Sequence, residues 1–211
     1  MVILWVLGDD YLLLCRECMA DPAVKMQDRF SYGDYRHWPD EERWELIGGV
    51  PYGMLPAPNR RHQGICGALY RQIASYLDGK PCHVYFAPFD LILPEHGEAD
   101  DDVDTVVQPD LLVICNREIL TSAGARGVPD LIVEILSPST ARKDTLEKFL
   151  LYERKGVREY WIVDPVAATV TIYLLGSDGR YGRPDIHGEE KTVSVTVLPD
   201  CEVVLEPLFR D

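Results

Sequence analysis

The spacing of apolar residues along this chain predicts a mixed α/β fold. Between residues 62 and 78 an apolar residue recurs at every fourth position, which is typical of an amphipathic helix. Nearly continuous apolar runs at 106–115 and 130–136 are instead typical of strands covered on both faces of a sheet. A predicted helix at about 140–155 and a strand at 157–163 follow the second run, which suits a parallel strand–helix–strand crossover.

Shorter elements precede and follow this central region. Residues 44–52 contain two apolar segments around a Gly-Gly pair, which predict a β-hairpin because glycine accepts the positive φ of a tight turn. The capping-box pattern Ser31-x-x-Asp34 predicts a short helix, and Pro88 marks an edge strand or a bulge. Further strands are predicted at 169–174, 193–197 and 203–205.

These elements form one predicted α/β domain at residues 29–211, with a mixed β-sheet flanked by helices and an amino-terminal β-hairpin region. Residues 1–28 form a separate extension. Their apolar stretch lacks a basic start, is interrupted by two aspartates, and is too short to span a bilayer, so we expect no membrane partner. Three interpretations stay open: an extra strand, a poorly ordered extension, or an upstream translation before a natural start at Met19 or Met26.

The charge balance limits the class of partner. The chain has 211 residues, and 35 acidic residues against 21 lysines and arginines give a formal net charge of -14. This excess excludes a protein that coats polyanions non-specifically, because such binding comes from basic side chains. The loop at 95–104 supplies six of the acids, whereas basic residues gather at 60–61 and at 142–158. A local nucleic-acid site is therefore still compatible with the composition.

The six cysteines do not predict a metal site or an exported protein. A Cys-x-x-Cys pair at 15–18 lacks the second pair of ligands that a zinc site needs. The other four cysteines lie in apolar or strand-like segments, where free cysteine is usually a small buried apolar residue. A reducing, cytoplasmic setting is therefore expected. These four are Cys66, Cys82, Cys115 and Cys201.

Two carboxylates interrupt the buried strand runs. Asp110 follows Pro109 in the first run, and Glu134 lies within the second. A charged carboxylate in a buried strand is unfavourable unless it is paired or bound to a metal ion. If the two strands are neighbours, the two carboxylates would form a site for Mg²⁺ or Mn²⁺. The alternative is that each carboxylate forms a buried ion pair with an arginine or a lysine.

The helix after Glu134 carries three polar residues on one face. Asp144, Lys148 and Tyr152 follow one another at intervals of four. One interpretation is a surface salt bridge beside a half-buried tyrosine. The other directs Lys148 toward Glu134, where its ammonium group would orient an attacking water and stabilise negative charge. Asp144 would then hold Lys148 in its active rotamer instead of forming an ordinary ion pair.

Together these residues resemble a nuclease superfamily. The Pro-Asp dipeptide at 109–110, followed by Glu134-x-Leu136, resembles the PD-(D/E)XK pattern. The longer signature is similar to that of the Uma family of restriction endonuclease-like proteins. It reads QPDLLVI, PDLIVEILSPST and GVREYWIVDP, with an aspartate, a lysine and a tyrosine between the last two segments.

Other segments extend this resemblance, and one position departs from it. Glu45 in WELIGG, His62 and the segment FAPFDLIL also match the family pattern, so the resemblance covers about residues 30–208. Leu136 stands where the superfamily has its lysine, and Lys148 fits a relocated position on the following helix. Relocation is physically reasonable because the chemistry needs an ammonium group at a point in space. It leaves open the alternative of a fold that binds without cleaving.

The resemblance implies roles for the residues around the two carboxylates. Asp110, Glu134 and the backbone carbonyl of Ile135 would bind Mg²⁺, and Lys148 would position the nucleophile. Glu45 would add a ligand or an orienting contact; the alternative is a hairpin acid that pairs with the arginine two residues before it or with solvent.

Three further residues are expected to support the site. Gln108 would hold a ligand carboxylate or, equally, satisfy the backbone. His62 would contact phosphate or water, or be structural at the start of its helix. Tyr152 is expected to pack more than to catalyse.

The implied function is a Mg²⁺-dependent endonuclease that hydrolyses phosphodiester bonds in DNA, with Mn²⁺ as a substitute metal. A homodimer would suit cleavage of both strands. One alternative is a degenerate nuclease-fold module that binds protein or nucleic acid without cleaving. Another is a hydrolase of small phosphoesters, although the sequence has no GxxxxGK[ST] phosphate loop.

Overall fold

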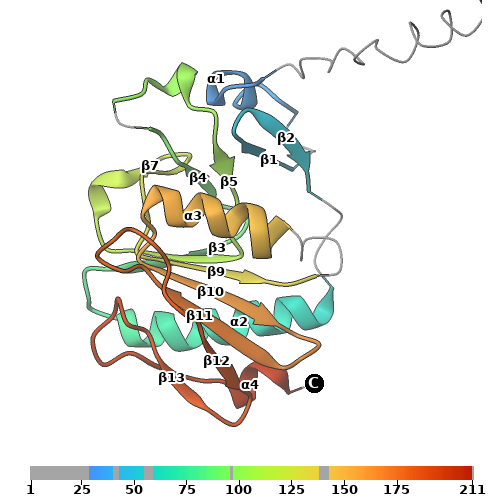
Figure 1. Ribbon diagram of the computed structural model, residues 1–211, viewed down its shortest axis with the longest axis vertical. Coiled ribbons are helices and arrows are strands. Elements are labelled where there is room, and N and C mark those ends of the chain that lie inside the picture. The colour runs from blue at the N-terminus through green and yellow to red at the C-terminus, as the bar shows by residue number, and fades with distance from the viewer. Residues whose placement is uncertain (1–28, 40–42, 55–58, 96, 138–142, 211) are drawn as a thin grey trace, which may run out of the picture.

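The structure is a computed structural model that describes residues 29–39, 43–54, 59–95, 97–137 and 143–210. Within these residues most strands belong to two six-stranded mixed sheets, and a two-stranded hairpin lies near the carboxyl terminus. The predicted α/β class is confirmed, although the single predicted sheet is divided into two (Figure 1). The extension at 1–28 lies outside the described residues.

The first sheet has the strand order β2-β1-β5-β4-β8-β7. Strands β4 and β8 are parallel, and the other neighbours are antiparallel. The predicted hairpin at 44–52 is confirmed as β1 and β2. The bounds are β1 (Trp44–Ile47), β2 (Val50–Gly53), β4 (Asp90–Ile92), β5 (Val106–Val107), β7 (Leu120–Thr121) and β8 (Gly124–Arg126).

The second sheet has the order β12-β11-β10-β9-β6-β3. Strands β9 and β10 are parallel, which confirms the predicted crossover, and the other pairs are antiparallel. The bounds are β3 (His83–Phe86), β6 (Leu111–Ile114), β9 (Leu131–Ile135), β10 (Glu159–Asp164), β11 (Thr169–Leu174) and β12 (Asp185–Gly188). The separate hairpin pairs β13 (Thr192–Ser194) with β14 (Glu202–Val204).

The helices are short except for one. The predicted capping box is present at the start of the first, where the side chain of Ser31 accepts from the backbone N–H of Asp34. Among the described residues, no helix is both long enough and apolar enough to cross a lipid bilayer. The α-helices are α1 (Tyr32–Tyr35), α2 (Arg60–Leu77), α3 (Phe149–Lys155) and α4 (Glu206–Phe209). The 3₁₀-helices are η3 (Asp100–Asp102) and η4 (Arg117–Ile119), and η5 (Lys143–Lys148) is a π-helix.

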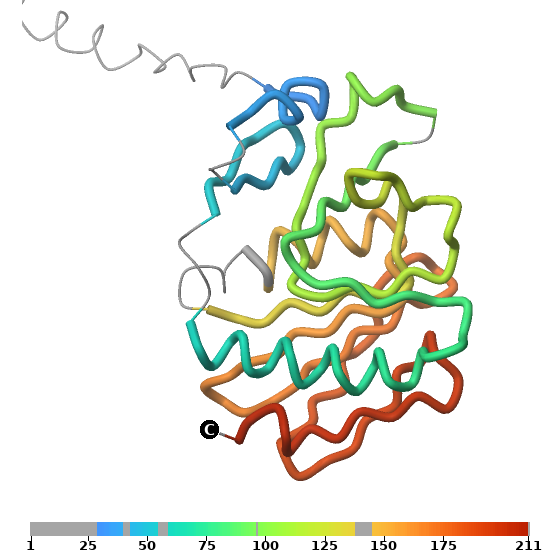
Figure 2. Tube along the Cα trace, turned by 180° about the vertical axis from the view of Figure 1, so that it is seen from behind, coloured from blue at the N-terminus to red at the C-terminus, as the bar shows by residue number. Residues whose placement is uncertain are grey.

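Helix α2 covers one face of the second sheet with the apolar positions that predicted it. Figure 2 shows it between this sheet and the carboxyl-terminal segment. The helix begins two residues earlier than predicted, because Asn59 caps it by accepting from the backbone N–H of His62 at 2.9 Å. Gly79, with a φ of +71°, follows its end as expected.

Helices η5 and α3 cover the opposite face of the same sheet (Figure 1). Leu151 and Tyr152 pack there against apolar side chains of β9 and β10. The predicted helix at 140–155 ends at Gly156 as expected, but its first described part is π-helical. The predicted α-helical spacing therefore fails there, because a π-helix closes i→i+5 hydrogen bonds.

The apolar run at 106–115 is not the single central strand that its composition predicts. It is divided into β5 and β6, which belong to different sheets. Pro109 lies at the break, and proline has no N–H to donate to a strand ladder. The chain therefore passes from one sheet to the other at residues 108–110, and the polar side chains there lie between the sheets.

The prediction that Cys82 and Cys115 are free is wrong. The two residues form a disulfide, with their Cα atoms 4.0 Å apart. Strands β3 and β6 pair with His83 opposite Ile114, so the cysteines one position further along are also opposite each other. Their separation of 33 residues gave no sign of this register. Among the described residues, Cys66 and Cys201 are free, as expected.

A buried glutamate on β10 of the second sheet, Glu159, holds the carboxyl-terminal segment against that sheet. The carboxylate of Glu159 accepts from Trp161 Nε1 at 2.7 Å and from the backbone N–H of Val197 at 2.8 Å. Burial raises the pKa of this carboxyl. Both donors would lose their acceptor in a Glu159→Ala variant.

We therefore expect Glu159→Ala to lower the free energy of unfolding by about 2–4 kcal/mol, since each buried donor without an acceptor costs about 1–3 kcal/mol. Urea denaturation measures this change. Glu202→Ala, at an exposed position on β14, is the control and should change stability little. Equal stability of the two variants would contradict the fastening role of Glu159.

Candidate functional site

Of the two sequence-predicted carboxylates, Glu134 lies on β9 and Asp110 directly precedes the neighbouring strand β6. Strands β6 and β9 are antiparallel with Leu111 opposite Val133, so one further step places Asp110 opposite Glu134. Asp110 Oδ2 accepts from the backbone N–H of Ile135 at 2.7 Å. The expected adjacency of the two strands is therefore confirmed, and the segment at Glu134 and Ile135 adjoins the Asp110 carboxylate.

A lysine joins Glu134 to a second buried glutamate. Lys148 Nζ lies 2.8 Å from Glu134 Oε1 and 2.8 Å from Glu45 Oε1. The lysine side chain is 3% exposed, and the glutamates are 3% and 0% exposed. The interpretation of Lys148 as a surface salt-bridge residue is wrong, and its direction toward Glu134 is confirmed. In this structure Glu134 forms the buried ion pair that was the alternative to a metal role.

Glu45 is part of this cluster and not an exposed hairpin acid. It reaches the cluster from β1 in the first sheet, and its Oε1 also accepts from the backbone N–H of Gln108 at 3.0 Å. The alternative in which Glu45 faces solvent is wrong, because its side chain is fully buried. The cluster therefore joins residues from both sheets.

Within the described residues, the Gln108 side chain forms no hydrogen bond with the Asp110 carboxylate. Its Oε1 accepts from the guanidinium of Arg43 at 2.6 and 3.0 Å, and its Nε2 donates to Asp90 Oδ1 at 2.8 Å. The predicted role as holder of a ligand carboxylate is therefore not seen for the side chain. The backbone N–H of Gln108 holds Glu45 instead.

Helix α2 holds Asp110 from the other side. His62 Nε2 lies 3.1 Å from Asp110 Oδ2, and Cys66 Sγ, one turn later, lies 3.5 Å from the backbone oxygen of Asp110. His62 is 9% exposed, and within the described part of the chain its Nδ1 has no hydrogen-bond partner. Burial, followed by the charge of Asp110, raises the pKa of the Cys66 thiol to about 11. Sequence reasoning missed Cys66, although its place four residues after His62 was a signal.

Tyr152 both packs and donates to the cluster. Its hydroxyl donates to Glu134 Oε1 at 2.8 Å, and its ring contacts Tyr160 edge-on at 5.1 Å between centroids. Burial and the charge of Glu134 raise its pKa well above the ordinary value, so the hydroxyl keeps its proton. Lys148 and Tyr152 thus share the face that their spacing predicts. The side chain of Asp144 lies outside the described residues.

The donor set at this site is one of hard oxygen ligands. Among the described residues, no three His, Cys, Asp or Glu side chains are grouped so that they could hold a metal ion. Asp110 and Glu134 offer two carboxylates, and the carbonyl of Ile135 offers a third oxygen. Mg²⁺ commonly takes one or two protein carboxylates and completes its shell with water, so this chemistry fits Mg²⁺.

Two of the basic residues on and after helix α3 form ion pairs. Lys155 contacts Glu95 at 2.7 Å, and Arg158 forms an ion pair with Asp130. Asp130, in the second Pro-Asp dipeptide, also accepts from the backbone N–H of Cys115 at 2.6 Å. Lys155 and Arg158 therefore do not form a patch of unpaired positive charge beside the site.

Comparison with known proteins places these residues in a family. Residues 32–206 match the model of the Uma2 family, which is described as "Putative restriction endonuclease". The chain belongs to this family. This Uma2 chain is 26% identical to an uncharacterized protein of Synechocystis sp. over 161 residues. The aligned region is 72% of this chain and 78% of that protein.

The Uma2 chain also shares its fold with a solved structure. A crystal structure from Anabaena variabilis, described as a "putative nuclease belonging to DUF820", matches it with a TM-score of 0.67 at 19% identity. The match covers 85% of this chain and 97% of the other. The Uma resemblance and the restriction endonuclease-like fold class predicted from the sequence are confirmed.

Proposed function

We propose that this Uma2 protein is a Mg²⁺-dependent endonuclease that hydrolyses phosphodiester bonds in DNA. The observation that carries the proposal is the buried Lys148 ammonium, 2.8 Å from Glu134, on the helix beside the strands of Asp110 and Glu134. This arrangement supplies the acid, acid and lysine of the nuclease pattern from three elements, although Leu136 takes the usual lysine position. Family membership supports the same activity.

Asp110, Glu134 and the carbonyl of Ile135 are the residues that would hold Mg²⁺. When bound, the ion would supply Lewis-acid polarisation of the phosphate and a more acidic water. Neighbouring groups of the protein hold both carboxylates in place. His62 and the backbone N–H of Ile135 hold Asp110 Oδ2, and Tyr152 holds Glu134 Oε1.

Lys148 and Glu45 form the second part of the proposed machinery. Glu45 accepts from the ammonium group and thereby fixes the long lysine side chain in one position. A fixed cation beside Glu134 would orient the attacking water and stabilise the charge that develops on the phosphate. Glu45 is therefore assigned a positioning role through Lys148.

A second candidate function is a degenerate nuclease fold that binds without cleaving. The observation that favours it is the closed ionic cluster, in which Lys148 already neutralises part of the charge of Glu45 and Glu134. Such a cluster can persist for stability alone. A measurement of metal binding distinguishes the two functions, because a purely structural cluster is not expected to bind a divalent cation.

Calorimetry with Mn²⁺ is the direct test. We expect the full chain to bind Mn²⁺, and Glu134→Ala to weaken binding by more than about tenfold, since metal affinity depends strongly on each ligand and its partners. Glu118→Ala, at an exposed position on η4, should bind as the unmodified chain does. Absence of Mn²⁺ binding together with tight DNA binding would favour the non-cleaving module. Equal affinity in both variants would overturn the assigned ligands.

A further inference from the structure

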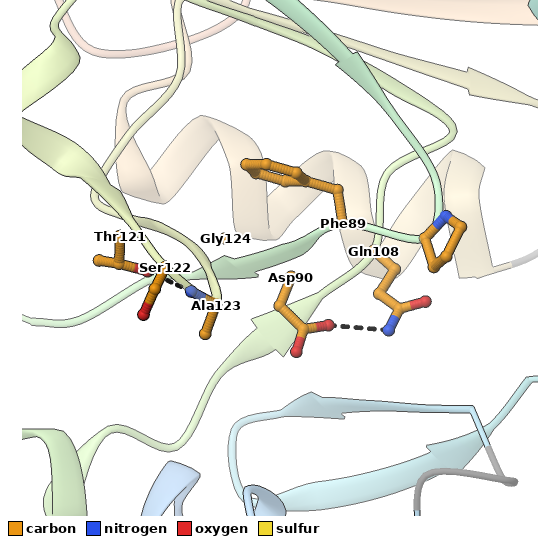
Figure 3. A pocket seen from close by; sticks show the side chains of 8 residues that line it. Phe89, Asp90, Gln108, Thr121, Ser122, Ala123 and Gly124 are labelled. Atoms are coloured by element: carbon orange, nitrogen blue, oxygen red, sulfur yellow. Dashed lines mark hydrogen bonds between the residues drawn. The ribbon is translucent and has the colours of Figure 1, made fainter.

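A hollow opens beside the proposed catalytic residues. It lies between β4, the turn joining β7 and β8, and the segment after β5, and its volume is about 350 Å³ (Figure 3). This volume is at the small end of the range for ligand pockets and suits a single ring system. The lining residues are Pro88, Phe89, Asp90, Gln108, Thr121, Ser122, Ala123 and Gly124.

The carboxylate of Asp90 gives this hollow its chemical character. Asp90 Oδ1 accepts from Tyr35 Oη at 3.0 Å and from Gln108 Nε2 at 2.8 Å. Its other oxygen accepts no hydrogen bond within the described part of the chain, and Figure 3 shows it pointing away from Gln108. Burial raises the pKa of this carboxyl, because a charged carboxylate is less well solvated there than in water. A ligand that donates hydrogen bonds would satisfy the second oxygen.

The walls of the hollow are attached to the proposed catalytic residues. The side chain of Gln108 lines the hollow while its backbone N–H donates to Glu45 Oε1 at 3.0 Å. On the other wall, Pro88 follows Ala87, whose N–H donates to the backbone oxygen of Asp110 at 3.1 Å. A ligand in the hollow would therefore lie next to the site of phosphodiester chemistry.

The lining favours a nucleobase over a phosphate. A partly desolvated carboxylate repels phosphate oxygens but accepts from amino groups on base edges. Phe89 also lines the hollow, but its ring, which is stacked on Tyr85 at 4.5 Å between centroids, leaves β4 on the side away from the Asp90 carboxylate (Figure 3). The recognition is therefore assigned to the carboxylate, and proteins commonly read unpaired bases by hydrogen bonds to the base edge.

We propose that this hollow binds one unpaired nucleobase that carries an exocyclic amino group, with Asp90 accepting from that group. The inference rests on the proposed nuclease function and adds a specificity determinant to it. Thymine offers mainly carbonyl oxygens to the carboxylate and is disfavoured. Cytosine is preferred over thymine, and cleavage is therefore directed to unpaired or distorted segments next to an amino-bearing base.

Binding of deoxynucleosides to the full chain, without metal, tests the hollow separately from catalysis. Saturation-transfer NMR should show deoxycytidine binding more tightly than thymidine. In Asp90→Asn, the amide oxygen still accepts from Tyr35 and Gln108, but a donor replaces the second oxygen. We expect the affinity for deoxycytidine to fall by about tenfold and the affinity for thymidine to rise, because the acceptor that the amino group needs is replaced by a donor. Such a reversal of preference cannot result from misfolding.

Two further variants complete the experiment. Glu118→Gln removes the same charge at an exposed position outside the hollow and should leave both affinities unchanged. Ala123→Phe, at the exposed rim, fills the hollow and should abolish binding of both deoxynucleosides. Equal binding of deoxycytidine and thymidine, or no binding of either, overturns the inference.

The experiments distinguish failure of the proposed nuclease function from failure of the proposed base pocket. If DNA is never cleaved but deoxycytidine binds in an Asp90-dependent manner, the nuclease function is wrong and the base pocket stands. If DNA is cleaved with the same efficiency next to cytosine and thymine in single strands, the pocket is wrong and the nuclease function stands.

Discussion

Lys148→Met is expected to lower the free energy of unfolding by about 3–5 kcal/mol, as removal of one partner from a buried ion pair generally does. The reason is that Glu45 and Glu134, at 0% and 3% exposed, would keep their carboxylates without the ammonium group between them. Methionine preserves most of the volume of the side chain, so the loss measures charge and not packing. Urea denaturation followed by circular dichroism gives the value.

The same substitution elsewhere on the helix is the control. Lys155 contacts Glu95 at 2.7 Å, and its side chain is 5% exposed, but the glutamate is 66% exposed. Because the charge left behind by Lys155→Met would stay in solvent, this variant should cost less than about 1 kcal/mol. Adding Glu134→Gln to Lys148→Met should recover part of the lost stability, because one unpaired charge is removed. A double variant no more stable than Lys148→Met would show that packing, and not charge, explains the loss.

Asp110→Asn is expected to reduce DNA cleavage in the presence of Mg²⁺ by more than about 100-fold, because the amide is a poor ligand in place of a carboxylate. The fold should be retained, since the amide oxygen can still accept from the backbone N–H of Ile135. Relaxation of supercoiled plasmid measures the rate, and thermal denaturation checks the fold.

The chain contains its own matched control for this variant. Pro129-Asp130 repeats the Pro-Asp dipeptide, but Asp130, directly before β9, accepts from the backbone N–H of Cys115 and pairs with Arg158. Asp130→Asn should therefore cleave DNA at close to the unmodified rate. If the two variants lose activity equally, Asp110 does not have the catalytic role assigned to it.

Local periodicity was sufficient to predict a strand of the second sheet and a helix that covers it. The fourfold spacing of Ile65, Leu69 and Ile73 predicted α2, and the apolar run before Glu134 predicted β9. The meeting of Lys148 with Glu134 was also predictable, because a helix between two parallel strands must return over them. These features depend on residues close together in the sequence.

The features that escaped prediction depend on long-range register. An apolar run can continue through a change of sheet, so the break at Pro109 looked like the middle of a strand. The Cys82–Cys115 disulfide follows from the pairing of β3 with β6, which no local pattern specifies. Asp90 was missed because its importance comes from Tyr35 and Gln108, which lie 55 and 18 residues away.

The ionic cluster has a consequence for how the molecule unfolds. Glu45 belongs to the first sheet, whereas Glu134 belongs to the second, and Lys148 contacts both. Separation of the sheets would pull this lysine away from one of its carboxylates and leave that charge in an apolar interior. Partial opening along this boundary therefore breaks a buried ion pair, so we expect the two sheets to unfold together.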